Sequence, residues 1–316
     1  MTTSWVAGTV RARALARRRI GAAAARALTT GDSVADAVQA LSRTPYGHDV
    51  RPHDSVAAAQ RGVGSALLWH LRVLAGWLPR DGVDVVRLLS GGFEIADLDD
   101  RLAQARGIPT AAPYRLGALA TAGRRLEGSR SAADVRSALR ASAWGDPGGA
   151  RPWEIACGTR LNWADQIVGR IPEAAAWARA QTALLLVRTV RVQHHTLAAP
   201  LTRRAETIVG PGFVDAVPSG NVPVGELARH LPADTRWVFD GLDRLDDAWR
   251  ADARWCHRVE ADGFALMRGA DFGRGPVVGA IAVRAIDAWR VRAALSAAAR
   301  RAVVGSDATE AFDAVA

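Results

Sequence analysis

The chain has 316 residues, of which 49% are hydrophobic, and a formal net charge of +9 with a sequence pI near 11.1. This apolar content suffices for a buried core spread over two or three domains. All 41 basic residues are arginines, which excludes enzymes that depend on a P-loop lysine or a Schiff-base lysine. The basic charge fits an anionic partner, whether nucleic acid, lipid headgroups or an acidic protein surface.

Most of the arginines are spread along predicted helices with aspartate and glutamate nearby, which is typical of solvated helix faces. A dense cluster occurs only at residues 11–19. No stretch approaches the roughly 18 uncharged apolar residues that cross a bilayer. The N-terminal segment has no long apolar core of the kind that a signal peptide carries, so we expect a cytoplasmic protein.

The chain repeats one short segment. SVADAVQALSRTPYG begins at Ser33 and SAADVRSALRASAWG begins at Ser131, so equivalent residues are 98 positions apart. Each copy opens with Ser-x-x-Asp before an apolar-periodic run, the pattern of a reciprocal N-terminal helix cap. Each copy closes on an aromatic residue and a glycine, where a short helix stops, docks its last ring and turns. A duplicated unit of this kind predicts an architecture in which helical repeats bury their faces against neighbours.

Long helices follow each predicted short helix. Apolar residues at steps of three and four, from Val56 to Leu78, predict a helix from about Asp54 that stops before Pro79. Further long helical segments are predicted at residues 83–106, 155–167, 172–186, 242–259 and 277–300. No alternating strand of useful length is present. We therefore predict an all-α fold of three quasi-repeated helical units.

The predicted units are residues 1–107, 108–210 and 223–316, the last with a C-terminal tail. A linker is predicted at residues 211–222, because the stretch around it is rich in proline and glycine. Cys157 and Cys256 are too few for a disulfide framework and lack the CxxC spacing of zinc ligands. We expect both cysteines to be buried as small hydrophobic residues.

The sequence lacks the GxSxG, HExxH, GxxxxGK and EF-hand patterns. Two histidine pairs, His48 with His53 and His194 with His195, are weak candidates for metal ligands. The second pair is predicted to be adjacent on a helix, where neighbouring side chains point in different directions. We predict no catalytic residue, no cofactor and no metal site.

Four motifs occur in a definite order along the chain. It opens with WVAGTVRAR at residues 5–13 and reaches LSRTPYG at residues 41–47; FEIADLDDRL follows at residues 93–102 and DAWRVR at residues 287–292. These motifs resemble the family of central-stalk subunits designated C in prokaryotic V/A-type rotary ATPases and d in eukaryotes. That family shows an aromatic residue with Arg-Val-Arg, then Leu-x-x-Thr-x-Tyr, an acidic residue with Asn-Leu, and Glu-x-x-Arg-x-Arg. Its Asn-Leu corresponds to Asp97-Leu98 here, so the chain is identified as a divergent member.

The resemblance implies a non-catalytic adaptor of the central stalk. Members of the family consist of three helical repeats that form a funnel-shaped socket, and they couple the rotating shaft to the membrane rotor ring during proton or sodium transport. The implied partners are the shaft subunits and the proteolipid subunits of the ring, at the inner face of the membrane. The density of arginines near the N-terminus and the last of the four motifs select the candidate interface residues, Arg11, Arg13, Arg290 and Arg292. Arginine suits bidentate contacts with carboxylates of a partner.

Two other classes of function stay open at this point. The high pI is also compatible with a basic all-helical nucleic-acid-binding module, although no helix-turn-helix, zinc or RNP signature is visible. An enzyme that uses His48 or Asp97 is the second alternative. The first predicts affinity that falls steeply with salt, and the second predicts a turnover that depends on one of these side chains.

Overall fold

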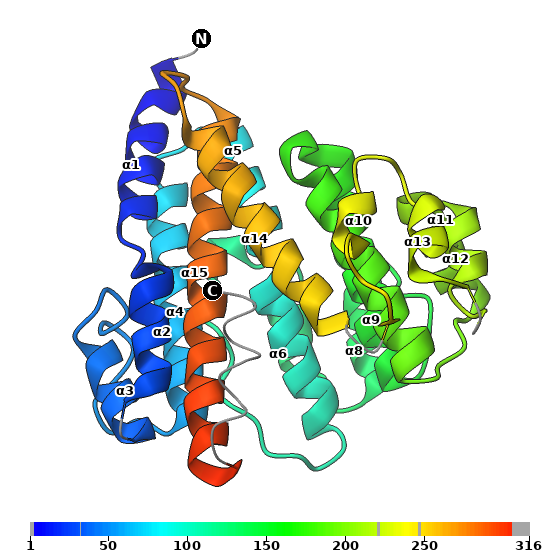
Figure 1. Cartoon of the computed structure of the whole chain (residues 1–316), viewed down its shortest axis with the longest axis horizontal. Coiled ribbons are helices and arrows are strands. Elements are labelled where there is room, and N and C mark those ends of the chain that lie inside the picture. The colour runs from blue at the N-terminus through cyan, green and yellow to red at the C-terminus, as the bar shows by residue number, and fades with distance from the viewer. Residues whose placement is uncertain (1–2, 32, 220–221, 246–247, 305–316) are drawn as a thin grey trace. The chain divides into compact units, whose positions relative to one another are not determined.

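A computed structural model of the chain describes residues 3–31, 33–219, 222–245 and 248–304. Within these residues the regular secondary structure consists of helices, without a strand. The predicted all-α class is therefore confirmed (Figure 1). The helices form two compact units. Unit 1 comprises Met1–Val86 and Cys256–Ala316, and unit 2 comprises Arg87–Trp255.

Unit 1 is built around its last helix. Its complete helices are α1 (Val6–Arg17), α2 (Gly21–Thr30), α3 (Val34–Ser42), α4 (Val56–Ala75) and α15 (Arg274–Val304), and it includes parts of α5 (Arg80–Leu89) and α14 (Ala248–Met267). Helix α15 packs against α1, α2, α3 and α4, and Figure 1 draws it in orange and red beside them. Buried side chains therefore occur all around α15, as expected for a central helix.

Unit 2 is built around α9. Its complete helices are α6 (Gly91–Gln104), α7 (Arg124–Glu127), α8 (Ala132–Arg140), α9 (Pro152–Arg170), α10 (Pro172–Val187), α11 (Ala199–Val209), α12 (Pro211–Ala216) and α13 (Val224–Arg229). Helix α9 packs against α6, α8, α10 and α11. A π-helical stretch, Arg188–Val192, continues α10. The core under α6 and α8 includes Leu98, Leu139, Trp144 and Ile155.

The predicted segment 83–106 contains two helices rather than one, because α5 ends at Leu89 and α6 begins at Gly91. A Cβ atom at Gly91 would lie 2.7 Å from Trp163 Nε1 and 2.9 Å from Trp144. Glycine is thus required where the two rings approach the backbone, and the break between the helices falls at this position.

The duplicated segment folds the same way in both units. Thr44 Oγ1 donates to the Leu41 carbonyl (2.6 Å) and accepts the Tyr46 N–H (3.2 Å). Ser142, its repeat equivalent, makes the same two hydrogen bonds around Trp144, at 2.7 and 3.1 Å. Tyr46 and Trp144 are both buried. The predicted docking of the last ring is therefore confirmed in each copy.

The equivalence extends into the long helices after a two-residue shift in register. Gly62 in α4 and Gly158 in α9 each occupy the seventh position of their helix. A Cβ atom at Gly62 would lie 2.4 Å from the Asp49 carbonyl oxygen, and one at Gly158 would lie 1.8 Å from that of Pro147. Each loop therefore rests directly on a helix backbone, which only glycine permits.

The segment predicted as a linker, residues 211–222, begins with the short helix α12. Phe213 in α12 is fully buried and stacks with Phe239, with ring centroids 6.1 Å apart.

The boundaries of the three predicted units do not coincide with those of units 1 and 2, and the threefold division stays a prediction. The predicted tail at residues 305–316 lies outside the described residues. Among the described residues, none of the helices is both long enough and apolar enough to cross a membrane.

Candidate functional site

The last of the four sequence motifs begins with a buried carboxylate in α15. Asp287 is fully buried, and its oxygens accept the Ile20 N–H (3.2 Å) and the Gly21 N–H (2.9 Å) at the start of α2. They also accept the Tyr46 hydroxyl (2.7 Å) and Nη1 of Arg284 (3.1 Å). We call this group the Asp287 site. It joins α15 to the start of α2 and to the ring that ends the first repeated segment.

The motif at residues 93–102 places Glu94 in the same situation in unit 2. Glu94 is 3% exposed and accepts the backbone N–H groups of Thr121 (2.9 Å), Ala122 (2.9 Å) and Gly123 (2.7 Å) just before α7. Its fourth donor is Nε1 of Trp144, at 2.8 Å. We call this group the Glu94 site. Gly21 and Gly123, which donate at the two sites, both have positive φ, at +80° and +49°.

The two sites explain why these motif positions carry acids. A carboxylate with four hydrogen-bond donors fixes the start of one short helix and the ring that ends another. Such charge-assisted bonds to backbone N–H groups are stronger than neutral ones. Both sites therefore have a structural role, because each carboxylate accepts four hydrogen bonds and is shielded from solvent.

The structure separates the N-terminal candidates, Arg11 and Arg13, into two roles. Arg11 is exposed, and its guanidinium lies 4.5 Å from the ring centroid of Trp77. Arg13 is half-buried and donates from Nη2 to the carbonyls of Gly269 and Asp271, each at 2.9 Å. Arg13 thus holds the loop between α14 and α15, whereas Arg11 is available at the surface.

The C-terminal candidates also differ. Arg290 is 2% exposed, and its guanidinium forms a bidentate ion pair with Glu260 at 2.8 and 3.1 Å. Arg290 is thus held inside unit 1, where other helices pack around α15, which argues against it as an interface residue. Arg292 is exposed, as expected of an interface residue. Its role in binding a partner stays a prediction.

The four arginines do not form one cluster. Arg13 contacts the loop just before α15 begins, and Arg290 lies 16 residues after Arg274 in that helix. At 1.5 Å per residue this is about 24 Å along the helix axis. Arg11 and Arg292 therefore remain as two separate exposed candidates in unit 1.

The other candidates from the sequence lie apart. His48 is exposed, hydrogen-bonds Asp49 (2.8 Å) and stacks on Trp69, while Asp97 is buried and accepts the Tyr114 N–H. His194 and His195 follow the π-helical stretch rather than sitting on a helix, so that expectation was wrong. No group of three metal-ligating side chains occurs in the described ranges.

Both cysteines are buried, as predicted, and neither forms a disulfide. Burial raises the pKa of Cys157 to about 11, and the hydrogen bond with Thr189 only partly opposes this. A thiol with so high a pKa is protonated at neutral pH and is a poor nucleophile. Cys157 is thus part of the core of unit 2.

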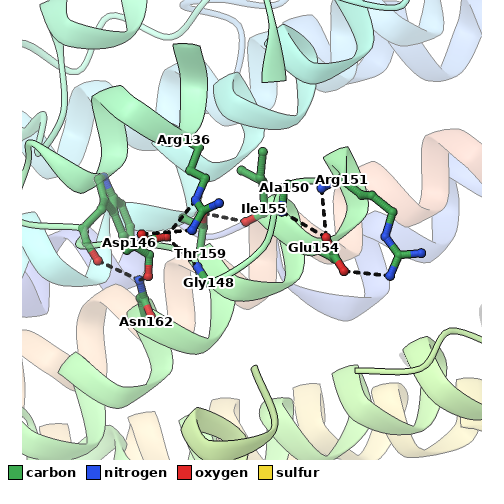
Figure 2. A network of polar contacts seen from close by, with 10 residues as sticks. Arg136, Asp146, Gly148, Ala150, Arg151, Glu154, Ile155, Thr159 and Asn162 are labelled. Atoms are coloured by element: carbon green, nitrogen blue, oxygen red, sulfur yellow. Dashed lines mark hydrogen bonds and ion pairs between the residues drawn. The ribbon is translucent and has the colours of Figure 1, made fainter. Parts of the chain in front are cut away.

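A polar network fixes the loop that leads into α9 (Figure 2). Asp146 receives two bonds from Arg136, at 3.0 and 3.1 Å. Asn162 donates to the carbonyls of Trp144 (2.9 Å) and Asp146 (3.1 Å), and accepts from Arg204. Beside these residues lies a cavity of about 250 Å³.

At the other end of that loop, Glu154 completes a cap at the start of α9 (Figure 2). Its Oε2 accepts the N–H groups of Ala150 (3.0 Å) and Arg151 (2.9 Å), and its Oε1 accepts Nη2 of Arg151. The hydrogen bond from the Arg151 side chain, followed by these backbone bonds, lowers the pKa of Glu154 to about 2. Glu154 in α9 thus holds the end of the loop by its backbone, and Asp146 within the loop accepts the Gly148 N–H (2.8 Å).

A larger open cavity, of about 490 Å³, lies beside the π-helical stretch. Its walls combine apolar side chains such as Leu186 and Val214 with His194, Thr202 and Asp215. His194 has a φ of +56°. Left-handed conformations are enriched several-fold for histidine among non-glycine residues, so this φ alone does not indicate a site.

Comparisons with known proteins add no relative: the chain matches no known family and no curated sequence.

The structure does reveal surface residues that the sequence does not single out. Val6, Val10 and Trp77 are exposed at 39%, 56% and 47% and belong to the same part of unit 1 as Arg11. The step of four residues between Val6 and Val10 is also typical of core residues. Only the packed structure shows which face of α1 is covered.

Proposed function

We propose that this chain is a non-catalytic adaptor of a V/A-type rotary ATPase, which joins the rotating shaft to the membrane rotor ring. The proposal includes the three-repeat, funnel-shaped socket and a location at the inner face of the membrane. Its partners are the shaft subunits and the proteolipid subunits of the ring.

The observation that carries the proposal is the equivalence of the Glu94 and Asp287 sites. The two stretches that resemble motifs of the rotary ATPase adaptor family, around residues 94 and 287, perform the same task in different units. A chance similarity of arginine-rich and alanine-rich segments gives no reason for such agreement. Repeated helical units locked by buried carboxylates also supply the stiffness that transmission of torque requires.

The exposed arginines supply the means of docking. Arg11 and Arg292 present guanidinium groups that can form bidentate bonds with carboxylates of a partner. Such pairs contribute more to orientation and association rate than to affinity. Arg13 and Arg290 are excluded from this part of the proposal, since internal acceptors already hold both.

A tagged full-length chain, recovered from detergent-solubilised native membranes, tests the proposal. We expect shaft, ring and nucleotide-binding subunits of a rotary ATPase to co-purify and to be identified by mass spectrometry. Arg11→Glu and Arg292→Glu should lower their recovery. Arg203→Glu changes an exposed arginine of α11 in unit 2 and should leave recovery unchanged.

Two outcomes contradict different parts of the proposal. Recovery of the chain without rotary ATPase subunits removes the adaptor function, and salt-sensitive binding of nucleic acid by the purified chain supports the basic-module alternative instead. Full recovery of the partners by both Arg11→Glu and Arg292→Glu removes the docking residues but leaves the function standing.

A further inference from the structure

The exposed face of α1 is a ridge whose first three residues are apolar and whose last is basic. Val6, Val10, Ala14 and Arg17 follow one another at steps of four, four and three, and all are exposed. Val10 is the more exposed of the two valines, at 56% against 39% for Val6. The opposite face of α1, which includes Leu15, is buried against the rest of unit 1. The ridge is therefore a fixed feature of a well-seated helix and not a fraying end.

Trp77, after α4, flanks the exposed face of α1 on the side of Arg11. A Cβ atom at Gly8 would lie 3.0 Å from the Trp77 carbonyl oxygen, so the helix and this loop are in direct contact. The Trp77 side chain is 47% exposed under the guanidinium of Arg11. An aromatic ring with a basic group above it extends the apolar surface while keeping charge at its edge.

The N-terminal segment that includes this ridge carries only positive side-chain charges. Residues 1–31 contain six arginines and no aspartate or glutamate. Arg17, Arg18 and Arg19 are exposed at the end of α1, and Arg19 lies 4.7 Å from the ring centroid of Phe264. The adjoining segments carry two exposed acids, Asp81 in α5 and Asp271 before α15. Basic side chains thus dominate the C-terminal half of the ridge, and valines dominate its N-terminal half.

We propose that this surface, defined by Val6, Val10, Arg17, Arg18 and Trp77, docks onto an anionic phospholipid membrane. Valine and tryptophan side chains gain by burial at the headgroup boundary, while arginines contact lipid phosphates. An exposed helix face suits a membrane, since a lipid surface needs no matching pocket. The proposal goes beyond the adaptor function and does not depend on it.

Membrane docking agrees better with these observations than nucleic-acid binding does. Nucleic acid is recognised through its phosphates by basic groups, and through stacking or base edges. Neither contact uses the exposed valines, which are central to the ridge. An acidic protein partner is the remaining alternative, and binding to pure lipid vesicles separates it from a membrane.

Flotation of the purified full-length chain with unilamellar vesicles tests the proposal. We expect binding to vesicles of equal parts phosphatidylglycerol and phosphatidylcholine, and little binding to phosphatidylcholine alone. Val10→Asp should weaken vesicle affinity about tenfold or more, because burial of the valine is lost. Val192→Asp is the matched control, since Val192 is 57% exposed in unit 2. Arg17→Glu should weaken binding roughly tenfold, and Arg203→Glu should not.

Circular dichroism of each variant shows that it has folded before its binding is compared. Equal binding to both kinds of vesicle, or equal losses for Val10→Asp and Val192→Asp, overturns the proposal. The proposal is also overturned if the wild-type chain does not bind vesicles but co-purifies with an acidic protein that the Val10→Asp variant fails to recover. Selective vesicle binding without recovery of rotary ATPase subunits supports this proposal while contradicting the adaptor function.

Discussion

The Glu94 and Asp287 sites solve the same problem with different donors. Glu94 accepts three backbone N–H groups and one indole N–H, all of them neutral. Asp287 accepts two backbone N–H groups, a tyrosine hydroxyl and the guanidinium of Arg284. The buried carboxylate therefore has four donors at each site, but only the Glu94 site has them without a buried cation.

The difference has a cost in unit 1. Arg284 is fully buried, and its Nε and Nη2 have no hydrogen-bond partner among the described residues. Desolvation of two ions is repaid only when geometry and further hydrogen bonds are good. The Asp287 site thus relies on mutual compensation between Asp287 and Arg284, whereas the Glu94 site relies on neutral donors alone.

The largest effect is expected from Asp287→Asn. The substitution leaves Arg284 as a buried charge without its bonded carboxylate and should lower the free energy of unfolding by about 3–5 kcal/mol. Glu94→Gln sets an amide N–H against backbone donors and should cost about 2 kcal/mol. Urea unfolding at neutral pH, followed by circular dichroism, measures both changes.

Two further variants sharpen this test. Arg284→Met in the Asp287→Asn background should recover part of the loss, because it removes the uncompensated charge. Asp99→Asn is the control, since its ion pair with Arg160 is partly exposed and should contribute at most about 1 kcal/mol. Equal losses for Asp287→Asn and Glu94→Gln, with no recovery by Arg284→Met, would mean that the buried cation plays no special part.

A second prediction concerns His70, which is buried in α4 near Arg284. Burial, and then the charge of Arg284, lower the pKa of His70 from 6.5 to about 4. Between these values the unfolded chain binds the proton and the folded chain does not, so stability falls as pH drops from 6.5 towards 4. The contribution of His70 to this fall is on the order of 2–3 kcal/mol.

The comparison between units supplies the control for His70. By the register of Gly62 and Gly158, its equivalent in α9 is Gln166, so His70→Gln introduces the residue that unit 2 already uses. We expect this variant to lose less stability than the wild type between pH 7 and pH 4.5, as measured by urea unfolding at each pH. An unchanged pH dependence would show that His70 is not the group that titrates.

Local features of both units could be predicted from the sequence. Ser33 and Ser131 begin helices, and Tyr46 and Trp144 are buried, as their patterns indicate. The helix caps and the turns that lead into the two rings join residues only a few positions apart. Propensity and spacing are sufficient for such contacts, because no tertiary packing has to be known.

The partners of the two rings could not be predicted in the same way. Tyr46 and Asp287 are 241 positions apart, and Trp144 and Glu94 are 50 positions apart. Arginine is mostly exposed in proteins. Arg290 is buried only because other helices surround α15. The exposure of Val10 has the converse origin: one face of α1 happens to be left uncovered, and helical spacing alone does not say which.

The smallest effects are expected at the two helix caps, which differ in detail. In α8, Ser131 Oγ accepts the Asp134 N–H (3.1 Å), and Asp134 accepts the N–H groups of Arg130 and Ser131. In α3, Ser33 Oγ accepts the Asp36 N–H (3.1 Å), but the Asp36 carboxylate is bonded to the Ser33 hydroxyl instead. The reciprocal cap predicted for both helices is thus complete in α8, and in α3 its serine half is observed.

Ser131→Ala and Ser33→Ala should each cost about 1 kcal/mol, because each removes the acceptor for one backbone N–H. The aspartates distinguish the caps. Backbone hydrogen bonding, first from Arg130, lowers the pKa of Asp134, so Asp134→Ala should lower the thermal midpoint more than Asp36→Ala does. Thermal melts at neutral pH give the comparison. Equal shifts for the two aspartate variants would indicate that Asp36 also reaches backbone donors in solution, and the two copies would then be capped alike.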